Sequence, residues 1–288
     1  MNAKYVGYRL AQRLSVRLAP PAAFRCAEAI ADTQWRWARG KRAIVQANLS
    51  RLRGGMVPWD SPLVREVFRN FGRYLVEFFT IHRVARPEVR LDGADYLEEG
   101  RRRRRGVILL TAHMGNWEVG AALIRRMGFP VTVLALPHDD PHMDRLFNAQ
   151  RRRCGVNVVP VGSEGARRGL QSLRDGGLVG LLGDQVFTED GVAVPFCGSR
   201  LLLPRGPAVL SLRSQAPIVP TFLIREGPWK FQLRFEPPIW PPPARQPTDE
   251  SVLGLVQGYA AVFEGYLRRF PEQWLMFTPI ANPETHEA

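Results

Sequence analysis

The chain has 288 residues, of which 45% are hydrophobic and 23% charged. This composition excludes a disordered protein, and the length suffices for a core without metal or disulfide support. The net charge is +13 and all but three of the 40 basic residues are arginine, which reflects either a coding bias or a partner with phosphates: nucleic acid, an anionic membrane surface or a phosphorylated substrate.

The first 55 residues are predicted to be helical. Apolar periodicity and breaks at Pro and Gly give three helices, at residues 3–18, 22–38 and 41–52. The first helix carries two parallel rows at four-residue spacing, apolar Leu10, Leu14 and Leu18 and basic Arg9, Arg13 and Arg17. Such a helix either packs on a core with its charged face in solvent, or lies in the headgroup region of an anionic membrane.

After a further helix at residues 61–85, short apolar runs alternate with helical patterns. Strands are predicted at residues 107–111, 131–136, 156–161, 178–182, 218–224 and 231–236. Helices are predicted at residues 118–127, 142–153, 166–175, 207–214 and 249–270. The alternation predicts an α/β fold with a mixed, mostly parallel sheet flanked by helices, and a site at the carboxyl ends of the strands.

No part of the sequence is predicted to cross a bilayer. A transmembrane helix needs about 20 mostly apolar residues, whereas the longest stretch without a charge, residues 251–263, has 13. Arg9, Arg13 and Arg17 also interrupt any signal-peptide core. Three scattered cysteines fit a reducing compartment better than a disulfide framework. We expect a protein that is cytosolic or lies on a membrane face.

Residues 106–127 are the most informative segment. A buried strand leads into a turn that holds His113, Gly115, Asn116 and Glu118, and a helix follows. An imidazole there could act as a general base, with a carboxylate to fix its tautomer. On a straight helix two residues five apart diverge by about 140°, so the turn must bend, which Gly115 permits. The alternative is that His113 only caps the helix.

Other chemistries have weaker support. Cys154 could be a nucleophile, but no neighbouring residue specifies that role, and the absence of a Gly-x-Ser-x-Gly elbow disfavours a serine triad. His138, Asp139, Asp140 and His142 have suitable side chains for a metal, yet their spacing matches no standard site. The arginines are dispersed without a recognition motif, so we expect neither a metal nor a nucleic-acid partner.

The segment from His113 to Glu118 (HMGNWE) resembles the His-x4-Asp/Glu motif of glycerolipid acyltransferases. It is most similar to the HxGNWE form of the late acyltransferases of lipid A biosynthesis and of the related phosphatidylinositol mannoside acyltransferases. Further stretches resemble that family in the same order. They are residues 47–51 (ANLSR), 151–155 (RRRCG), 183–185 (GDQ), 192–198 (VAVPFCG), 216–220 (APIVP) and 271–274 (PEQW).

The resemblance implies transfer of a fatty acyl group from a thioester, on acyl carrier protein or coenzyme A, to a hydroxyl of a glycolipid. A lipid A precursor is the first acceptor to consider, with phosphatidylinositol mannoside or another phospholipid-type acceptor as the alternative. His113 would take the hydroxyl proton and Glu118 would orient His113. No acyl-enzyme and no cofactor are expected, and the intact pair argues against a catalytically silent relative.

The resemblance also implies substrate-binding residues. Arg151, with Arg153 as its nearest rival, would bind a phosphate, and Asp184 would hold Arg151 or the acceptor. Gln185 follows in the same block, and Asn116 belongs to the motif. Backbone N–H groups near Gly115 could stabilise the oxyanion of the tetrahedral intermediate.

By the same resemblance, residues 1–55 are membrane-associating helices and residues 56–288 are the acyltransferase domain. The protein would then be peripheral on the cytoplasmic face of the bacterial inner membrane. Many lipid A relatives have a spanning anchor where this chain offers only a basic amphipathic helix. Many also have a second acid where Val186 stands here, and Glu189 or Asp190 are candidates to replace it.

Overall fold

The computed structural model describes residues 3–103, 105–186, 191–243 and 247–280. The helices are α1 (Ala3–Arg17), α2 (Pro20–Trp37), α3 (Arg39–Arg53), α4 (Pro62–Thr80), α5 (Asp95–Arg102), α6 (Trp117–Arg126), α7 (Pro141–Arg153), α8 (Ser163–Arg174), α9 (Gly206–Ser214) and α10 (Asp249–Arg269), with short 3-10 turns η1 (Ile81–Arg83) and η2 (Pro271–Gln273). The strands are β1 (Glu88–Asp92), β2 (Val107–Thr111), β3 (Val131–Ala135), β4 (Asn157–Pro160), β5 (Leu178–Leu182), β6 (Gly191–Phe196), β7 (Ser199–Pro204), β8 (Ile218–Gly227) and β9 (Lys230–Phe235).

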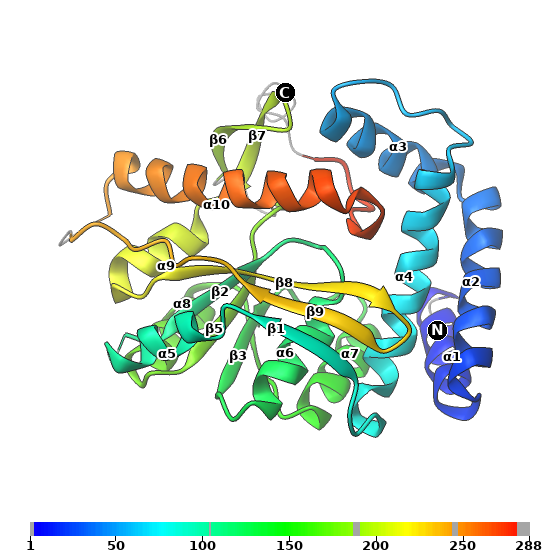
Figure 1. The fold of residues 1–288 in the computed structure, drawn as a ribbon, viewed down its shortest axis with the longest axis horizontal. Helices are drawn as coiled ribbons and strands as arrows, with labels where there is room; N and C mark the ends of the chain where they lie inside the picture. The colour runs from blue at the N-terminus through cyan, green and yellow to red at the C-terminus, as the bar shows by residue number, and fades with distance from the viewer. Residues whose placement is uncertain (1–2, 104, 187–190, 244–246, 281–288) are drawn as a thin grey trace.

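Seven strands form one sheet in the order β1-β9-β8-β2-β5-β3-β4, which runs from the front of Figure 1 to its back. The strands β8, β2, β5, β3 and β4 are parallel, whereas β8 and β9 pair antiparallel and β1 runs with β9. The predicted α/β fold with a mixed, mostly parallel sheet flanked by helices is therefore confirmed. In such a sheet the carboxyl ends of neighbouring parallel strands meet at one edge.

Each face of the sheet has its own hydrophobic core. Successive residues of β2 alternate between the two, because side chains of a strand point to opposite faces. Ile108 and Leu110 belong to the core beneath α10, which Phe222 and Phe263 share, and Leu109 belongs to the core that contains Val119 and Leu123 of α6. Both faces are covered, so β2 reads as a continuous apolar run.

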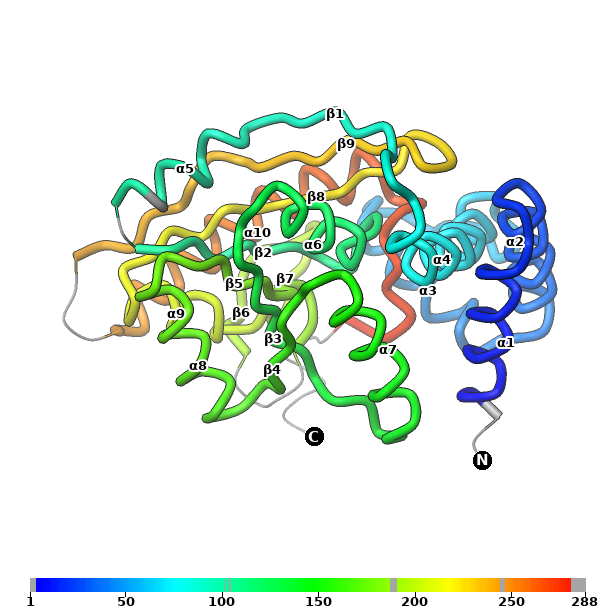
Figure 2. The backbone as a smooth tube through the Cα atoms, turned by 90° about the horizontal axis from the view of Figure 1, so that it is seen from below, coloured from blue at the N-terminus to red at the C-terminus, as the bar shows by residue number. Residues whose placement is uncertain are grey.

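The helices α1 to α4 stand together at one end of the sheet (Figures 1 and 2). The carboxyl ends of the parallel strands face α4, since Asn116, just beyond β2, donates to the Tyr74 carbonyl oxygen and to the Glu77 side chain. Among the described residues, no helix is both long enough and apolar enough to cross a membrane. The proposed division at residue 55 stays a prediction.

The sequence analysis did not predict β1, α5 or the hairpin formed by β6 and β7. β1 is an edge strand with alternating charges, EVRLD, and α5 is a short charged helix, DYLEEGRR; neither has the apolar run by which strands and helices were recognised. The third is the antiparallel β6–β7 hairpin. It stands beside α10 in Figure 1 and buries Val194, Phe196, Leu201 and Leu203 in the core on that face.

Candidate active site

His113 lies two residues beyond β2 and is held by a carboxylate from the neighbouring strand. Its Nδ1 is 2.8 Å from Oδ1 of Asp184, and its backbone N–H donates to Oδ2 of the same residue at 2.9 Å. Asp184 follows β5, which pairs with β2. The His113 side chain remains 18% exposed, whereas that of Asp184 is fully buried. The imidazole therefore has one ring nitrogen anchored inside the protein.

Asp184 is held as a carboxylate. Burial alone raises the pKa of Asp184, but the nearby His113 charge and hydrogen bonds from His113 and Trp274 outweigh burial and lower that pKa below its ordinary value. The Trp274 indole N–H donates to Oδ2 at 3.0 Å. An ionised Asp184 accepts the Nδ1 proton, which leaves Nε2 of His113 as the ring atom that can accept a proton.

Glu118 does not contact His113 but pairs with Arg151. Its two carboxylate oxygens accept from the Arg151 guanidinium, with Nη2 at 2.5 Å from Oε1 and Nε at 3.0 Å from Oε2. The prediction that Glu118 orients His113 is thus corrected. Of the two roles predicted for Asp184, the contact with Arg151 is corrected and the contact with the acceptor stays a prediction. The reason is geometric: Glu118 is already in the first turn of α6, which directs its side chain toward α7.

The Arg151–Glu118 pair is nearly enclosed, with side chains 12% and 6% exposed. Burial lowers the pKa of Arg151, but the Glu118 charge and hydrogen bonds outweigh it, so that pKa lies above its ordinary value. The remaining Nη1 donates to Asn148. The guanidinium predicted to bind a phosphate is consequently engaged with protein groups on all of its nitrogens.

Backbone hydrogen bonds to β8 and η2 hold the turn that carries His113. Gly115 has a φ of +61°, and an added Cβ would lie 1.9 Å from the Leu223 carbonyl oxygen, so no other residue fits. Its N–H donates to the Gln273 carbonyl oxygen, and the Asn116 N–H donates to that of Leu223. These two N–H groups are therefore occupied, and stabilisation of an oxyanion by other backbone N–H groups near Gly115 stays a prediction.

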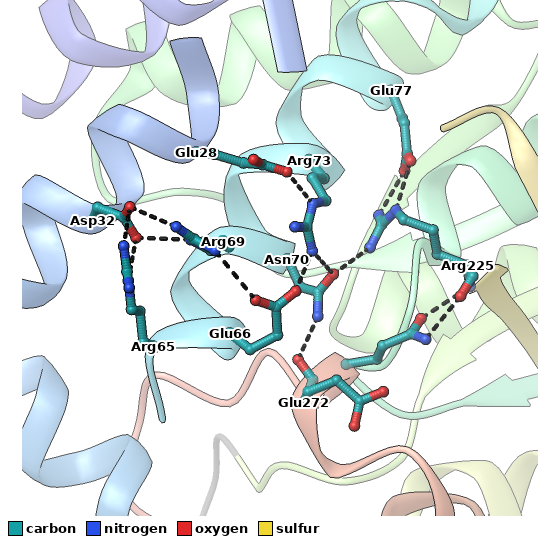
Figure 3. Close-up of polar contacts among 11 residues, drawn as sticks. Glu28, Asp32, Arg65, Glu66, Arg69, Asn70, Arg73, Glu77, Arg225 and Glu272 are labelled. Carbon is teal, nitrogen blue, oxygen red and sulfur yellow. Dashed lines mark hydrogen bonds and ion pairs between the residues drawn. The ribbon is translucent and has the colours of Figure 1, made fainter. Parts of the chain in front are cut away.

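Asn116 is a fully buried supporting residue and not a substrate contact. Its Oδ1 caps α6 by accepting from the Val119 N–H, and its Nδ2 donates to Glu77 at 2.7 Å. The carboxylate of Glu77 also pairs with Arg225 through two contacts of 2.6 Å, as Figure 3 shows. The Arg225 backbone exchanges two hydrogen bonds with the Gln273 side-chain amide. This buried network connects α4, β8 and η2 to the His113 turn.

Glu77 and Arg225 were not identified from the sequence. The available signal was a charged residue at a core position of an otherwise apolar helix or strand, since a buried charge needs a partner. The other predicted residues are dispersed. Gln185 is half-buried beside Asp184, and Arg153 is exposed on α7. Glu189 and Asp190 lie outside the residues that the structure describes.

The alternative chemistries gain no support. Burial raises the pKa of the Cys154 thiol, which disfavours a thiolate nucleophile. Asp140 accepts from the His142 N–H as the cap of α7. Within the described ranges, no group of three or more His, Cys, Asp or Glu side chains could hold a metal ion.

The matching family profile and the two relatives described here are all acyltransferases. The profile of the bacterial lipid A biosynthesis acyltransferases matches residues 8–280. The chain is similar to a phosphatidylinositol mannoside acyltransferase of Mycobacterium tuberculosis, with 30% identity over 82% of this chain and 75% of the relative. It is also similar to a lipid A biosynthesis palmitoleoyltransferase of Escherichia coli, with 27% identity over 74% of this chain and 69% of the relative.

Proposed function

Because the chain belongs to the bacterial lipid A biosynthesis acyltransferase family, we propose that it moves a fatty acyl group from a thioester, on acyl carrier protein or coenzyme A, to a hydroxyl of a glycolipid. The observation that carries the proposal is the 2.8 Å contact between His113 Nδ1 and the buried Asp184 carboxylate. It gives a partly exposed imidazole a fixed tautomer and a nearby negative charge, as a general base requires.

In the proposed reaction, Nε2 of His113 accepts the proton of the acceptor hydroxyl as its oxygen attacks the thioester carbonyl carbon. Asp184 stabilises the imidazolium that forms, in the way the carboxylate of a serine-protease triad does. The tetrahedral intermediate then collapses: the carbon–sulfur bond breaks, and the leaving thiolate takes the proton from the imidazolium. Atoms and charges balance without a resident metal or cofactor, so the proposal includes none.

The role proposed for the Arg151–Glu118 pair is to position the catalytic turn. Glu118 belongs to the first turn of α6, which begins just after the turn that carries His113. Its ion pair with Arg151 connects α6 to α7. Each nitrogen of Arg151 donates to Glu118 or Asn148, and both carboxylate oxygens of Glu118 accept from Arg151. The pair therefore acts through geometry and does not exchange protons with a substrate.

Loss of His113 tests the proposal. Removal of a general base costs typically about 10²–10⁴-fold in rate, so we expect His113→Ala to lose at least about a hundredfold of its acyl transfer while circular dichroism shows the same fold. The thermal midpoint should fall, because the substitution leaves the buried Asp184 carboxylate without its imidazole partner. His82→Asn is the matched control, because it keeps an acceptor for the Gln150 amide. Acyl transfer by His113→Ala within tenfold of wild type would remove His113 from the mechanism.

Two acceptors are considered. The family profile favours a lipid A precursor, whereas the 30% identity to a phosphatidylinositol mannoside acyltransferase favours that lipid. Mass spectrometry of envelope lipids from a strain without the gene would identify the acceptor by the acyl chain that is missing. Purified protein given each acceptor with both thioester donors should acylate only the lipid that the strain fails to acylate.

Association with an anionic membrane surface is part of the proposal, and α1 supports it. The ring of Tyr8 packs edge-on against the ring of Phe147 on α7, so the side of α1 that carries Tyr8 faces the rest of the protein. Val6 and Leu10 are 45% and 54% exposed, and Arg13 and Arg17 continue the same outer row at helical spacing. An apolar pair beside two cations is typical of a helix that lies in the headgroup region. The location implied is the cytoplasmic face of the inner membrane.

Vesicle binding tests this surface. Each cation close to an anionic bilayer contributes about 1 kcal/mol, so the double substitution Arg13→Gln and Arg17→Gln should weaken partition onto phosphatidylglycerol-containing vesicles by roughly thirtyfold. A control with the same change of charge is Arg174→Gln with Arg213→Gln, on α8 and α9. Equal partition of the two double variants would refute the α1 surface.

A further inference from the structure

A basic groove lies between α1 and α7, away from the His113 turn. Its volume is about 230 Å³, and Arg9, Arg145, Arg153 and His142 line it without any carboxylate among its lining residues. In the described part of the chain, no ion pair joins these three arginines to an acid. Two of them contact side chains without a carboxylate: Arg9 donates to Gln12 at 2.7 Å, and Nη2 of Arg145 lies 2.9 Å from Nδ1 of His142.

A second cavity, lined by Arg73 and Arg225, shows the opposite charge pattern. It measures about 340 Å³, and its two arginines are both neutralised: Arg73 pairs with Glu28 and Glu66, and Arg225 with Glu77 (Figure 3). An added anion would gain little from these paired cations. In the α1–α7 groove the three arginines have no acidic partner among the lining residues, and they line the same concave surface.

The groove is on the far side of α7 from the candidate active site. Residues 142, 145, 149 and 153 share one face at helical spacing, while Arg151, which holds Glu118, projects about 160° from Arg153 because each residue advances 100°. A helix with side chains is about 10–12 Å across. A ligand in the groove would therefore be separated from the Glu118 pair by about one helix diameter.

We propose that the α1–α7 groove binds a phosphate group of one of the two substrates. The inference rests on the proposed acyl transfer, because phosphates occur on both sides of that reaction: the pantetheine arm of either thioester donor carries one, and so can a glycolipid headgroup. Planar guanidinium groups bind phosphate through paired, charge-assisted hydrogen bonds. A separation of a helix diameter fits a phosphate remote from the reacting carbon and excludes it from the chemical step.

The experiment replaces all three groove arginines, as Arg9→Gln, Arg145→Gln and Arg153→Gln together. The KM of the substrate whose phosphate is bound should rise by about 10- to 100-fold, with kcat within about threefold of wild type. A rise confined to the thioester assigns the groove to the donor, and a rise confined to the glycolipid assigns it to the acceptor headgroup. Unchanged KM values for both substrates would overturn the proposal.

The matched control removes three exposed arginines elsewhere: Arg25→Gln on α2, Arg152→Gln on α7 and Arg213→Gln on α9. It has the same net charge as the groove variant, so any general effect of charge appears in both. If the control raises KM as much as the groove variant does, the groove is not the site.

A binding measurement separates this proposal from the proposed function. Inorganic phosphate, added at constant ionic strength against chloride, should raise the thermal midpoint of the wild type and of the control by about 2 °C and leave the groove variant unchanged. This readout needs no turnover, so it holds even if the wild type acylates neither lipid. Equal stabilisation of all three proteins, or of none, would refute a phosphate site in the groove.

Discussion

Two buried carboxylates flank the turn that carries His113, and their partners differ in kind. Asp184 faces an imidazole, a group that gains and loses a proton near neutral pH. Glu118 faces the guanidinium of Arg151, which stays charged under all working conditions. The first carboxylate can therefore respond to a proton that moves during a reaction, whereas the second can only keep two helices in place. The proposed mechanism thus gives chemistry to Asp184 and positioning to Glu118.

The largest expected effect follows from Asp184→Asn. An amide cannot stabilise an imidazolium as a carboxylate does, and it can favour the wrong tautomer of His113, so we expect kcat to fall by about 10³–10⁴-fold. The measurement is single-turnover acyl transfer, with circular dichroism to confirm folding. The control is Asp92→Asn, because Asp92 is also a carboxylate that accepts a hydrogen bond, from Gln232, but lies on β1. If Asp184→Asn kept a tenth of the activity, Asp184 would belong with Glu118 as a positioning residue.

A smaller effect on activity, and a larger one on stability, is expected for Glu118→Gln. Breaking one partner of a buried ion pair costs about 3–5 kcal/mol, so urea unfolding should show a loss near 3 kcal/mol. Arg151→Gln should lose a similar amount, and the double variant much less than the sum, with a coupling energy of about 1–3 kcal/mol. Strict additivity would show that the two side chains do not depend on each other.

The smallest effect is expected for Trp274→Phe. This change removes the indole N–H that donates to Asp184 but leaves the two donors of His113 in place. One hydrogen bond to a charged group contributes about 1.5–3 kcal/mol, and the lost ring volume adds a cavity cost. We expect a fall in kcat of about tenfold or less. A loss as deep as that of Asp184→Asn would mean that Trp274, and not the imidazole, keeps Asp184 in place.

The sequence allowed β2, β5 and the turn at His113 to be predicted, because apolar runs and helical periodicity are local properties. It did not reveal which acid reaches the imidazole. Glu118 is five residues from His113 and Asp184 is 71, yet β5 lies beside β2 in the sheet. Strand order arises from how crossover helices return the chain, and no local pattern encodes it.

The buried ion pair between Glu77 and Arg225 was missed for a related reason. Each residue interrupts an apolar pattern in its own element, and only the contact between α4 and β8 explains both. The edge strand β1 was not predicted because three of its five residues are exposed, so its charged sequence resembles that of a loop. Long-range pairing and edge position are therefore what local periodicity could not supply.

Residues 271–275 follow α10 and contact both the turn that carries His113 and the Asp184 side chain. The Gln273 carbonyl oxygen accepts from Gly115, the Leu275 N–H donates to the His113 carbonyl oxygen, and Trp274 donates to Asp184. During translation, His113 and Asp184 are synthesised before residues 271–275. A nascent chain that ends before residue 271 therefore holds the His113 imidazole and the Asp184 carboxylate without the contacts that residues 271–275 make with them.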